Sequence, residues 1–365
     1  MKKKKVLLVT LQSVNIGNRL QNYALKQTLE KVGCEVIVPT YVLPGEEEQT
    51  VRYQIKYLLA MIGVSRYREI KWQKKRKANF HKFNRIYIGK QPRISFGSVK
   101  KKKWDQYDYA VTGSDQVWHR WSADPNELDY FYLMFMPIKK RISYAASFGF
   151  SEFPKADWVI HERGLKEMNC LSCREHEGAD LILKKTGRKA QVLADPVFLL
   201  EKEQWMQIEK EPEKKPKDCY CFWYFLGQKP DCNNLEKKQT DQQIVSVFDK
   251  TQKEYYAIGP QEFVWLLHHA ENVYTDSFHA CAFALLFQKE FTVFRRCEYG
   301  MEDMFGRIES LLKNFGLWEE AFSNARSIHI SKEKLADTAN ALKPMREQAY
   351  QYLMKSLGNL QDRRK

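Results

Sequence analysis

The turn at residues 275–279 holds the side chains of this sequence that are best suited to chemistry. A short apolar strand precedes the turn and an almost wholly apolar helix follows it, so we expect a polar turn between two buried elements. Asp276 or Ser277 can cap the helix, and His279 then falls in its first turn, where unpaired N–H groups and the helix dipole favour anions. A histidine in that place can exchange protons near neutral pH. The structural alternative is a core helix whose buried histidine hydrogen-bonds a neighbour.

Other polar loops also follow predicted strands. In open α/β sheets the ligand binds outside the carboxyl ends of the strands, so a substrate site is expected at these loops. They offer glycines for close backbone approach, carboxylates and arginines, which together suit group transfer on an anionic substrate. Each arginine could equally be an ordinary surface or helix-end residue. The residues concerned are Gly17, Asn18, Ser114, Asp115, Gly149, Arg295 and Arg296.

Several common site motifs are missing from the sequence. It contains no P-loop, no G-x-G-x-x-G and no G-x-S-x-G. The sequence therefore gives no motif evidence for a kinase, a nicotinamide dehydrogenase or a serine hydrolase. Two cysteine pairs, Cys170 with Cys173 and Cys219 with Cys221, resemble zinc ligands. The second pair lies in an apolar strand whose alternate residues point to opposite faces, so we expect buried thiols and no metal site.

The elements that must position these loops alternate between strand and helix, twice over. With 365 residues and 44% hydrophobic content, the chain is long enough for two domains of ordinary size. The pattern predicts two doubly wound α/β units and a helical tail, residues 332–365, broken at Pro344. Asn18 can cap the first helix and Gly33 can close it. The expected strands are residues 6–10, 34–38, 107–111, 141–147, 191–193, 219–225, 273–275 and 291–294, and the expected helices are residues 18–32, 51–88, 155–168, 175–187, 261–270 and a helix from 277.

This pattern predicts an N-terminal Rossmann-like lobe at 1–168 with a basic helical insertion at 51–103, a C-terminal lobe at 169–330, and C-terminal helices at 331–365. The basic start, Lys2–Lys5, imitates a signal peptide, but the apolar run after it stops at Leu11. No apolar run approaches the length of a membrane span. We therefore expect a cytoplasmic protein.

Nearly the whole net charge of +15 lies in residues 66–103, where fifteen basic residues face one acidic residue, a net charge of +14. A solvated helix face with a basic loop is the first interpretation of such a run. The second is a docking face for an anionic membrane surface or a diphosphate-linked substrate. Nucleic acid is the weakest of the three, because the sequence carries no zinc-finger, ribonucleoprotein or helix-turn-helix signature.

The motifs that carry chemistry resemble those of a known family, the polysaccharide pyruvyl transferases. The likeness runs through most of the chain, and the shared order of the motifs makes it specific. Ser172–Glu175 looks like the family's Ser-x-Arg-Glu, and Thr275–His279 looks like its histidine motif. The other matching segments are Asn15–Leu25, Gly113–Trp118, Arg141–Gly149, Asp195-Pro196 and Arg307-Ile308 with Leu311-Leu312.

The resemblance implies a fold like that of the type-B glycosyltransferases, with two Rossmann-like lobes facing a central cleft. The family's namesake reaction moves the enolpyruvyl unit of phosphoenolpyruvate onto two hydroxyls of a sugar, giving a pyruvate ketal and phosphate in the synthesis of cell-surface polysaccharides. His279 would protonate the enol carbon. Asp115 or Asp276 would orient the attacking hydroxyls or accept their protons. The scheme requires no metal, and no cofactor besides the donor.

The donor's carboxylate and phosphate need fixed positive charge. Arg174 is the family's match for this role, and Arg307 is a further candidate beside the two arginines named above. Many members carry an arginine two positions before the histidine, where this chain has Ser277. Arg295 or Arg296 could replace it from the neighbouring strand end, or the chain could use another donor. Gly17, Asn18, Ser114 and Ser277 complete the expected substrate contacts.

Two other functions stay open from the sequence. One is a sugar-nucleotide-dependent glycosyltransferase on the same fold, and the other is a non-catalytic scaffold of a polysaccharide assembly. In each reading the partner is a saccharide, free or lipid-linked. The sequence does not name the acceptor sugar, and the basic segment would hold a lipid-linked one near a membrane surface.

Overall fold

The computed structural model describes residues 3–41, 61, 68–89, 91–101, 104–228, 230, 242–249, 251–296 and 305–358. The chain divides into two compact units. Unit 1 comprises Met1–Pro44, Arg85–Leu200 and Leu342–Lys365, and unit 2 comprises Gly45–Asn84 and Glu201–Ala341. This division differs from the predicted one in three places, because residues 169–200 and the end of the chain belong to unit 1 and the described part of the basic helix belongs to unit 2.

Unit 1 is built on a parallel four-stranded sheet in the order β2-β1-β5-β6. Its central strand β1 has an unbroken apolar run whose residues are fully buried, as expected for a parallel sheet covered on both faces. The predicted strand 141–147 ends early because Ala145 has a φ of 44°, which breaks the extended backbone. The strands are β1 (Lys4–Val9), β2 (Cys34–Ile37), β5 (Tyr109–Thr112) and β6 (Arg141–Ser143).

Helix α1 (Ile16–Lys31) covers this sheet, and its N-cap lies three residues earlier than predicted. Its N-cap is Asn15, whose side chain accepts a hydrogen bond from the backbone N–H of Asn18 at 3.3 Å. The predicted cap, Asn18, therefore lies inside the first turn, and that prediction was wrong. Gly33, with a φ of 92°, follows the end of the helix as predicted.

The remaining elements of unit 1 are short. Two further strand pairs, β3 with β4 and β7 with β8, lie outside the main sheet. These elements are β3 (Thr40–Tyr41), η2 (Asn84–Ile88, of which Asn84 falls in unit 2), β4 (Arg93–Ile94), η3 (Phe96–Lys101), α4 (Glu127–Phe131), η4 (Ile138–Lys140), α5 (Trp158–Glu167), β7 (Ser172–Cys173), α6 (His176–Thr186), β8 (Gln191–Val192) and η5 (Pro196–Leu199).

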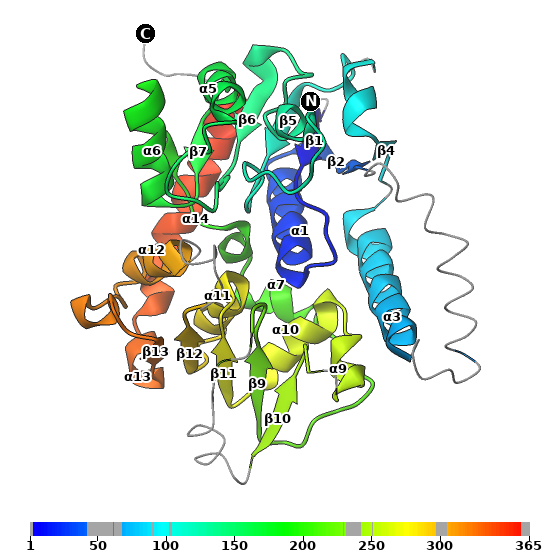
Figure 1. Ribbon diagram of the computed structural model, residues 1–365, viewed down its shortest axis with the longest axis vertical. Helices are drawn as coiled ribbons and strands as arrows, with labels where there is room; N and C mark the ends of the chain where they lie inside the picture. The colour runs from blue at the N-terminus through cyan, green and yellow to red at the C-terminus, as the bar shows by residue number, and fades with distance from the viewer. Residues whose placement is uncertain are drawn as a thin grey trace. The chain divides into compact units, whose positions relative to one another are not determined.

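Unit 2 contains a five-stranded sheet in the order β10-β9-β11-β12-β13, visible in Figure 1. All neighbours are parallel except β12 and β13, which pair antiparallel. The strands are β9 (Tyr220–Tyr224), β10 (Gln243–Ser246), β11 (Asn272–Thr275), β12 (Phe291–Phe294) and β13 (Ser327–Ile330), and the helices are α7 (Lys202–Met206), α9 (Lys253–Tyr256), α10 (Pro260–His269), α11 (Phe278–Leu286), α12 (Gly306–Asn314), η7 (Glu320–Phe322) and α13 (Lys332–Leu335).

Helix α3 (Arg68–Phe83) carries the described core of the basic segment and packs against α9 and α10 of unit 2 (Figure 1). Arg76 is buried there: its guanidinium lies over the rings of Phe80, Phe248 and Tyr256 and donates to the Tyr256 carbonyl at 2.8 Å. Burial lowers the pKa of Arg76. The basic run 74–77 is therefore not one solvated face, because Arg76 belongs to the core. Residues 51–60, 62–67, 90, 102 and 103 of the predicted insertion lie outside the described residues.

Helix α14 (Thr338–Ser356) runs without interruption through Pro344, so the predicted break at this proline was wrong. Proline removes one helical hydrogen bond, but tertiary contacts hold the part of the helix that follows Pro344. Arg346 donates to the carbonyls of Phe198 and Leu200, and the Tyr352 hydroxyl donates to a carbonyl of β6. Within the described ranges, α14 and every other helix are too short or too polar to cross a membrane.

Candidate functional site

In unit 2 the predicted turn lies between β11 and α11, at the carboxyl end of the sheet. The Thr275 hydroxyl donates to the Tyr224 carbonyl at 2.6 Å and accepts the backbone N–H of Ser277 at 2.9 Å, so the turn is tied to the end of β9. Ser277 occupies the N-cap position of α11, as predicted, but its side chain makes no capping hydrogen bond. The first turn of α11 therefore begins without the side-chain cap that the sequence suggested.

Both carboxylate oxygens of Asp276 accept hydrogen bonds from neighbouring groups. Oδ1 accepts the backbone N–H of Leu226 at 2.7 Å, and Oδ2 accepts that of Gly227 at 2.8 Å. Arg296 donates to Oδ2 as well, through Nε at 2.9 Å. Asp276 thus fixes the loop after β9 and one guanidinium beside the turn. This arrangement suits the orienting role that we expected for Asp276 better than the role of a proton acceptor.

The two arginines after β12 point to different surroundings. Arg295 donates to the carbonyls of Phe322, Ser323 and Ala325, and its guanidinium lies 3.8 Å from the ring centre of Phe305. These contacts tie Arg295 to the segment before β13. Arg296 instead donates to both the side chain and the main-chain carbonyl of Asp276. Of the two, Arg296 is therefore the one that lies next to the turn containing Ser277.

His279 lies in the first turn of α11, as predicted, and is buried with 7% of its surface exposed. Its ring stands edge-on to that of Phe278 at a centroid distance of 5.3 Å. Arg307 lies in the first turn of α12, which packs against α11. The structure thus brings His279, Asp276 and Arg296 to one end of the unit 2 sheet.

In unit 1 the predicted loop residues form a buried polar network around Asp115. Its Oδ2 accepts from the Asn18 side chain, and its Oδ1 accepts the backbone N–H of Gln116 at 3.0 Å. Asn18 also accepts from the Ser13 hydroxyl. Asp115 has a φ of 69°, a left-handed conformation that aspartate tolerates better than most residues and that is frequent at functional sites.

Ser114, the residue before Asp115, extends the same hydrogen-bond network. It is fully buried, its hydroxyl bonds the Ala145 carbonyl at 3.0 Å and Asp195 at 3.2 Å, and its N–H donates to Gln21. Gly113 has a φ of 116°, and a Cβ there would lie 2.1 Å from the Tyr144 carbonyl oxygen. Only glycine fits this close approach. Gly17 lies buried in the first turn of α1.

Arg174 is surrounded by carboxylates. Its guanidinium bonds Glu175 at 2.8 Å and Asp195 at 2.9 Å, and lies 3.7 Å from Asp115. Burial works against its charge, but Glu175, Asp195 and Asp115 together outweigh burial and raise the pKa of Arg174. Because three acidic groups already compensate this cation, the arrangement favours a structural role over the predicted contact with a donor anion.

Arg19 lies in the matched segment 15–25 and received no role from the sequence, yet it is less compensated than Arg174. It is 6% exposed, and among the described residues its Nη2 donates to the Gln12 carbonyl at 2.6 Å while Nε and Nη1 have no hydrogen-bond partner. Burial lowers the pKa of Arg19 to about 10. Asn22, one turn later, is fully buried with neither side-chain polar atom bonded within the described chain. The sequence signal was the run of polar residues inside an otherwise buried first helix.

The cysteine prediction was right for two thiols and wrong for one. Cys173 and Cys221 are buried, Cys170 is half-buried, and Cys219 is exposed. Burial raises the pKa of both Cys173 and Cys221, so these thiols stay protonated. Side chains of the types that can ligate a metal lie together elsewhere in the described part of the chain. Glu209, His268 and His269 lie before β11, at the opposite end of that strand from His279.

Comparison with solved structures shows the fold. The chain is similar to the UDP-GlcNAc 2-epimerase from Neisseria meningitidis bound to UDP-GlcNAc, with a TM-score of 0.51, 13% identity, and coverage of 98% of this chain and 100% of that one. It is also similar to a UDP-N-acetylglucosamine 2-epimerase with a TM-score of 0.54, 11% identity, and coverage of 100% and 99%. These likenesses confirm the predicted α/β fold with two Rossmann-like lobes, resembling the type-B glycosyltransferase fold.

Comparison with curated proteins finds none that matches this chain. The sequence model of the polysaccharide pyruvyl transferases, in contrast, matches residues 15–298. That range begins at the N-cap of α1 and includes the Asp115 network, Arg174 and the turn before His279. On this evidence the chain belongs to the polysaccharide pyruvyl transferase family.

Proposed function

We propose that this protein transfers the pyruvyl unit of phosphoenolpyruvate to two hydroxyls of a saccharide. The first hydroxyl adds to the enol carbon, while the methylene carbon takes up a proton and becomes a methyl group. The second hydroxyl then displaces phosphate, which leaves with the remaining proton, so the products are a cyclic ketal and inorganic phosphate. Membership of the family supports this reaction class, and the turn before α11 supports the roles of the residues.

The contact between Arg296 and Asp276 is the observation that carries the proposal. Many family members hold an arginine at the position of Ser277, and here a guanidinium reaches the same turn from the end of β12. Arg296 thus supplies the fork-shaped cation that a carboxylate or phosphate of the donor needs. Asp276 holds that cation in place. Phosphoenolpyruvate therefore remains the donor despite the serine at 277.

His279 is the proton donor in this proposal. It lies two residues beyond the N-cap of α11, beside the end of the strand where ligands bind in open α/β sheets. A positioned acid typically contributes about 10²–10⁴-fold to such a step. The helix N-terminus around it favours the negative charge of the leaving phosphate.

Unit 1 contains polar groups of its own, for which we propose contacts with the acceptor. Asp115, fixed by Asn18 and by the backbone N–H of Gln116, orients a hydroxyl of the acceptor. Arg19 offers two guanidinium nitrogens that no described residue satisfies, and a buried cation of this kind gains most from an anionic group of a substrate. A diphosphate-linked acceptor has such a group.

The exposed lysines of α3 add membrane docking to the proposal. Lys71, Lys74, Lys77 and Lys82 are exposed, whereas Arg76 faces the core. Each basic side chain near an anionic bilayer contributes roughly 1 kcal/mol of attraction. Binding to the membrane surface through these lysines would bring the protein close to a lipid-linked saccharide.

Release of inorganic phosphate tests the proposed reaction. The purified chain is incubated with phosphoenolpyruvate and a panel of free and lipid-linked saccharides, and phosphate is measured with and without each acceptor. The proposal predicts phosphate release that depends on one class of acceptor. A parallel panel of sugar nucleotides tests the alternative, because glycosyl transfer would release a nucleotide and leave phosphoenolpyruvate unchanged. Release with neither donor would favour the scaffold.

A further inference from the structure

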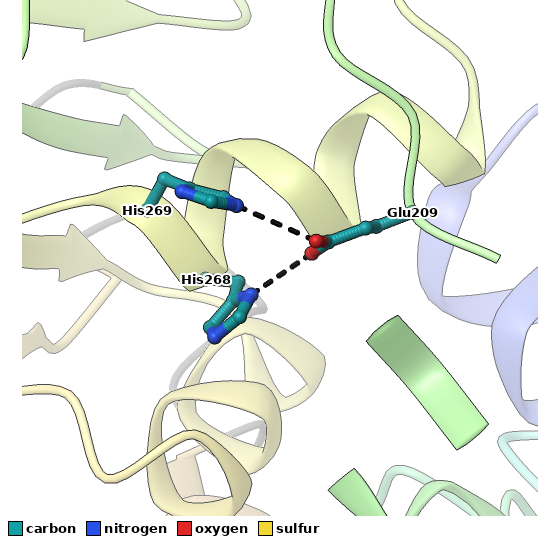
Figure 2. Close-up of side chains that lie close together, drawn as sticks. All are labelled: Glu209, His268 and His269. Atoms are coloured by element: carbon teal, nitrogen blue, oxygen red, sulfur yellow. Dashed lines mark hydrogen bonds and ion pairs between the residues drawn. The ribbon is translucent and has the colours of Figure 1, made fainter. Parts of the chain in front are cut away.

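Three potential metal ligands lie together in unit 2, away from the proposed active site. Figure 2 shows Glu209 between His268 and His269, with one carboxylate oxygen directed at each imidazole. Nδ1 of His268 lies 2.9 Å from Oε2, and Nε2 of His269 lies 3.4 Å from Oε1. The three ligand atoms all lie within 4.8 Å of one another. Two imidazoles and a carboxylate are a common donor set for Zn²⁺ in proteins.

Aromatic stacking fixes the orientation of both rings. His269 stacks on Trp265 at a centroid distance of 4.3 Å and an interplanar angle of 19°. His268 stacks on Phe287 at 4.5 Å and 22°. Adjacent residues on a helix point about 100° apart. Both imidazoles nevertheless face Glu209, and each ring is stacked on a different aromatic side chain. Rings held in this way need little reorganisation to ligate a metal.

The carboxylate reaches the histidines because its backbone is tied to the start of the same helix. The carbonyl of Ile208 accepts from the Gln261 side chain at 3.0 Å, and the backbone N–H of Lys210 donates to the Gln261 carbonyl at 3.2 Å. The Lys210 ammonium pairs with Glu262 at 2.6 Å. Glu209 is thus clamped from both sides onto α10, whose last two residues are His268 and His269.

The local charge also suits a cation. A neutral imidazole has a lone pair for a metal, and the carboxylate supplies negative charge. The His269 side chain is 43% exposed, which leaves solvent access on one side.

We propose that Glu209, His268 and His269 form a binding site for a divalent transition metal, with Zn²⁺ as the best fit to its donor atoms. Nδ1 of His268, Nε2 of His269 and one Glu209 oxygen would be the protein ligands, and water would complete the coordination. The donor atoms need only small side-chain shifts to reach the bond lengths of about 2.0–2.2 Å that Zn²⁺ requires. The metal would fasten the segment after α7 to the end of α10, so its role is structural.

A Zn²⁺ titration of the chelator-treated full chain, followed by calorimetry, tests this site. His269→Ala removes an exposed ligand, and Glu209→Gln keeps the shape of the side chain but removes its charge. His329→Ala is the matched control, because His329 also faces a glutamate, Glu290, at 3.6 Å, but the described residues offer no third ligand there. We expect the parent and His329→Ala to bind one Zn²⁺ with equal affinity. His269→Ala and Glu209→Gln should bind it at least tenfold more weakly.

Thermal unfolding with and without Zn²⁺ provides a second readout that does not depend on a variant's own stability. A metal that binds the folded chain raises the midpoint, by an amount that grows with the logarithm of the metal concentration divided by its Kd. The midpoint should therefore rise with Zn²⁺ in the parent and in His329→Ala, and should hardly change in His269→Ala. Equal Zn²⁺ affinity in the parent and His269→Ala, or an equal loss in His329→Ala, would overturn the proposal and leave Glu209 as a hydrogen-bond acceptor for two histidines.

Discussion

The guanidinium of Arg296 is bonded to Asp276 at two points. Nε donates to the carboxylate at 2.9 Å and Nη2 donates to the main-chain carbonyl at 3.3 Å. This contact places an arginine side chain next to Ser277, although the two residues are far apart in the sequence. In our proposal Arg296 supplies at this turn the guanidinium that Ser277 lacks.

Exchanging the position of the arginine tests this relationship. Arg296→Ala should raise the KM for phosphoenolpyruvate by about 10–100-fold, because a charge-assisted bidentate contact contributes roughly 1.5–3 kcal/mol. Ser277→Arg in the Arg296→Ala background should recover part of that loss, since it restores a guanidinium at the turn. Steady-state kinetics of the two variants and the parent provide the measurement.

Arg295→Ala is the matched control for that exchange. Arg295 donates to carbonyls of residues 322–325 and not to the turn, so its loss should lower the unfolding temperature and leave the KM for the donor unchanged. If Arg295→Ala raises the KM as much as Arg296→Ala does, the assignment of the donor cation to Arg296 is wrong.

Arg174 should contribute to stability and not to donor binding. Arg174→Ala leaves Asp195 and Glu175 buried without their cation, which typically costs about 3–5 kcal/mol. The partly exposed pair Arg120–Asp157 provides a comparison, because Arg120→Ala should cost only about 1 kcal/mol. Denaturant unfolding measures both losses. A raised KM for phosphoenolpyruvate in Arg174→Lys at unchanged stability would instead support the original prediction of a donor contact.

The sequence predicted the central strands well because their apolar runs leave few alternatives. In the unit 2 sheet the sequence missed β10 and β13, which are less apolar than their neighbours: β13 buries only every second residue and β10 is mostly half-buried. Such strands are stabilised by hydrogen bonds to a neighbouring strand. The local sequence does not show which strand will be the neighbour. The continuous helix through Pro344 has the same origin, since the contacts of Arg346 and Tyr352 come from residues more than 140 positions away.

The place of the candidate site was predictable, whereas the partners of its side chains were not. Polar turns after parallel strands must lie at the carboxyl edge of their sheet, so His279 could be placed at that edge of one sheet and Asp115 at that edge of the other. Whether an arginine is available for a substrate depends on its neighbours in space. The three carboxylates around Arg174 lie in motifs, but the sequence does not show that they surround this side chain. Arg295 is bound by carbonyls of residues 322–325, which no motif indicated. Arg19 received no role because nothing in its spacing distinguishes a buried arginine from an exposed one.

The exposed lysines of α3 should mediate binding to anionic vesicles. Replacing Lys71, Lys74, Lys77 and Lys82 with Gln should weaken binding to vesicles that contain an anionic lipid, and the parent's binding should fall steeply with salt. Unfolding temperature should stay the same. Arg76→Gln is the contrasting variant, because it removes a buried contact and should destabilise the fold. Vesicle sedimentation measures binding, and equal binding by the fourfold variant would leave the lysines as a solvated face.

His161 should make the stability of unit 1 depend on pH. Its side chain is 1% exposed, and its Nδ1 lies 2.7 Å from the Tyr132 hydroxyl. Burial lowers the pKa of His161 from 6.5 to about 4. The charge of Asp157 acts against this shift, and the charges of Arg120 and His119 add to it. Between these two values the unfolded chain binds more protons, so the free energy of unfolding should fall by up to about 3 kcal/mol as pH falls from 7 to 4.

Denaturant unfolding at several pH values measures this dependence. His161→Phe removes the titrating group and keeps an aromatic ring among Phe148, Phe150 and Phe153, so the variant's stability should fall less between pH 7 and 4. Parallel curves for the parent and the variant would contradict the assignment of this pH dependence to His161.

Transfer carried out in D₂O tests the central claim most directly. If the protein joins phosphoenolpyruvate to a saccharide diol by protonating the methylene carbon, the product should be a pyruvate ketal whose methyl group carries one deuterium. Mass spectrometry and NMR measure this. His279→Gln should form that product at least about 10²-fold more slowly while keeping its fold. A ketal formed equally fast by His279→Gln would contradict the role of this histidine. A product that contains a sugar from a nucleotide donor, and no ketal from phosphoenolpyruvate, would contradict the proposed function itself.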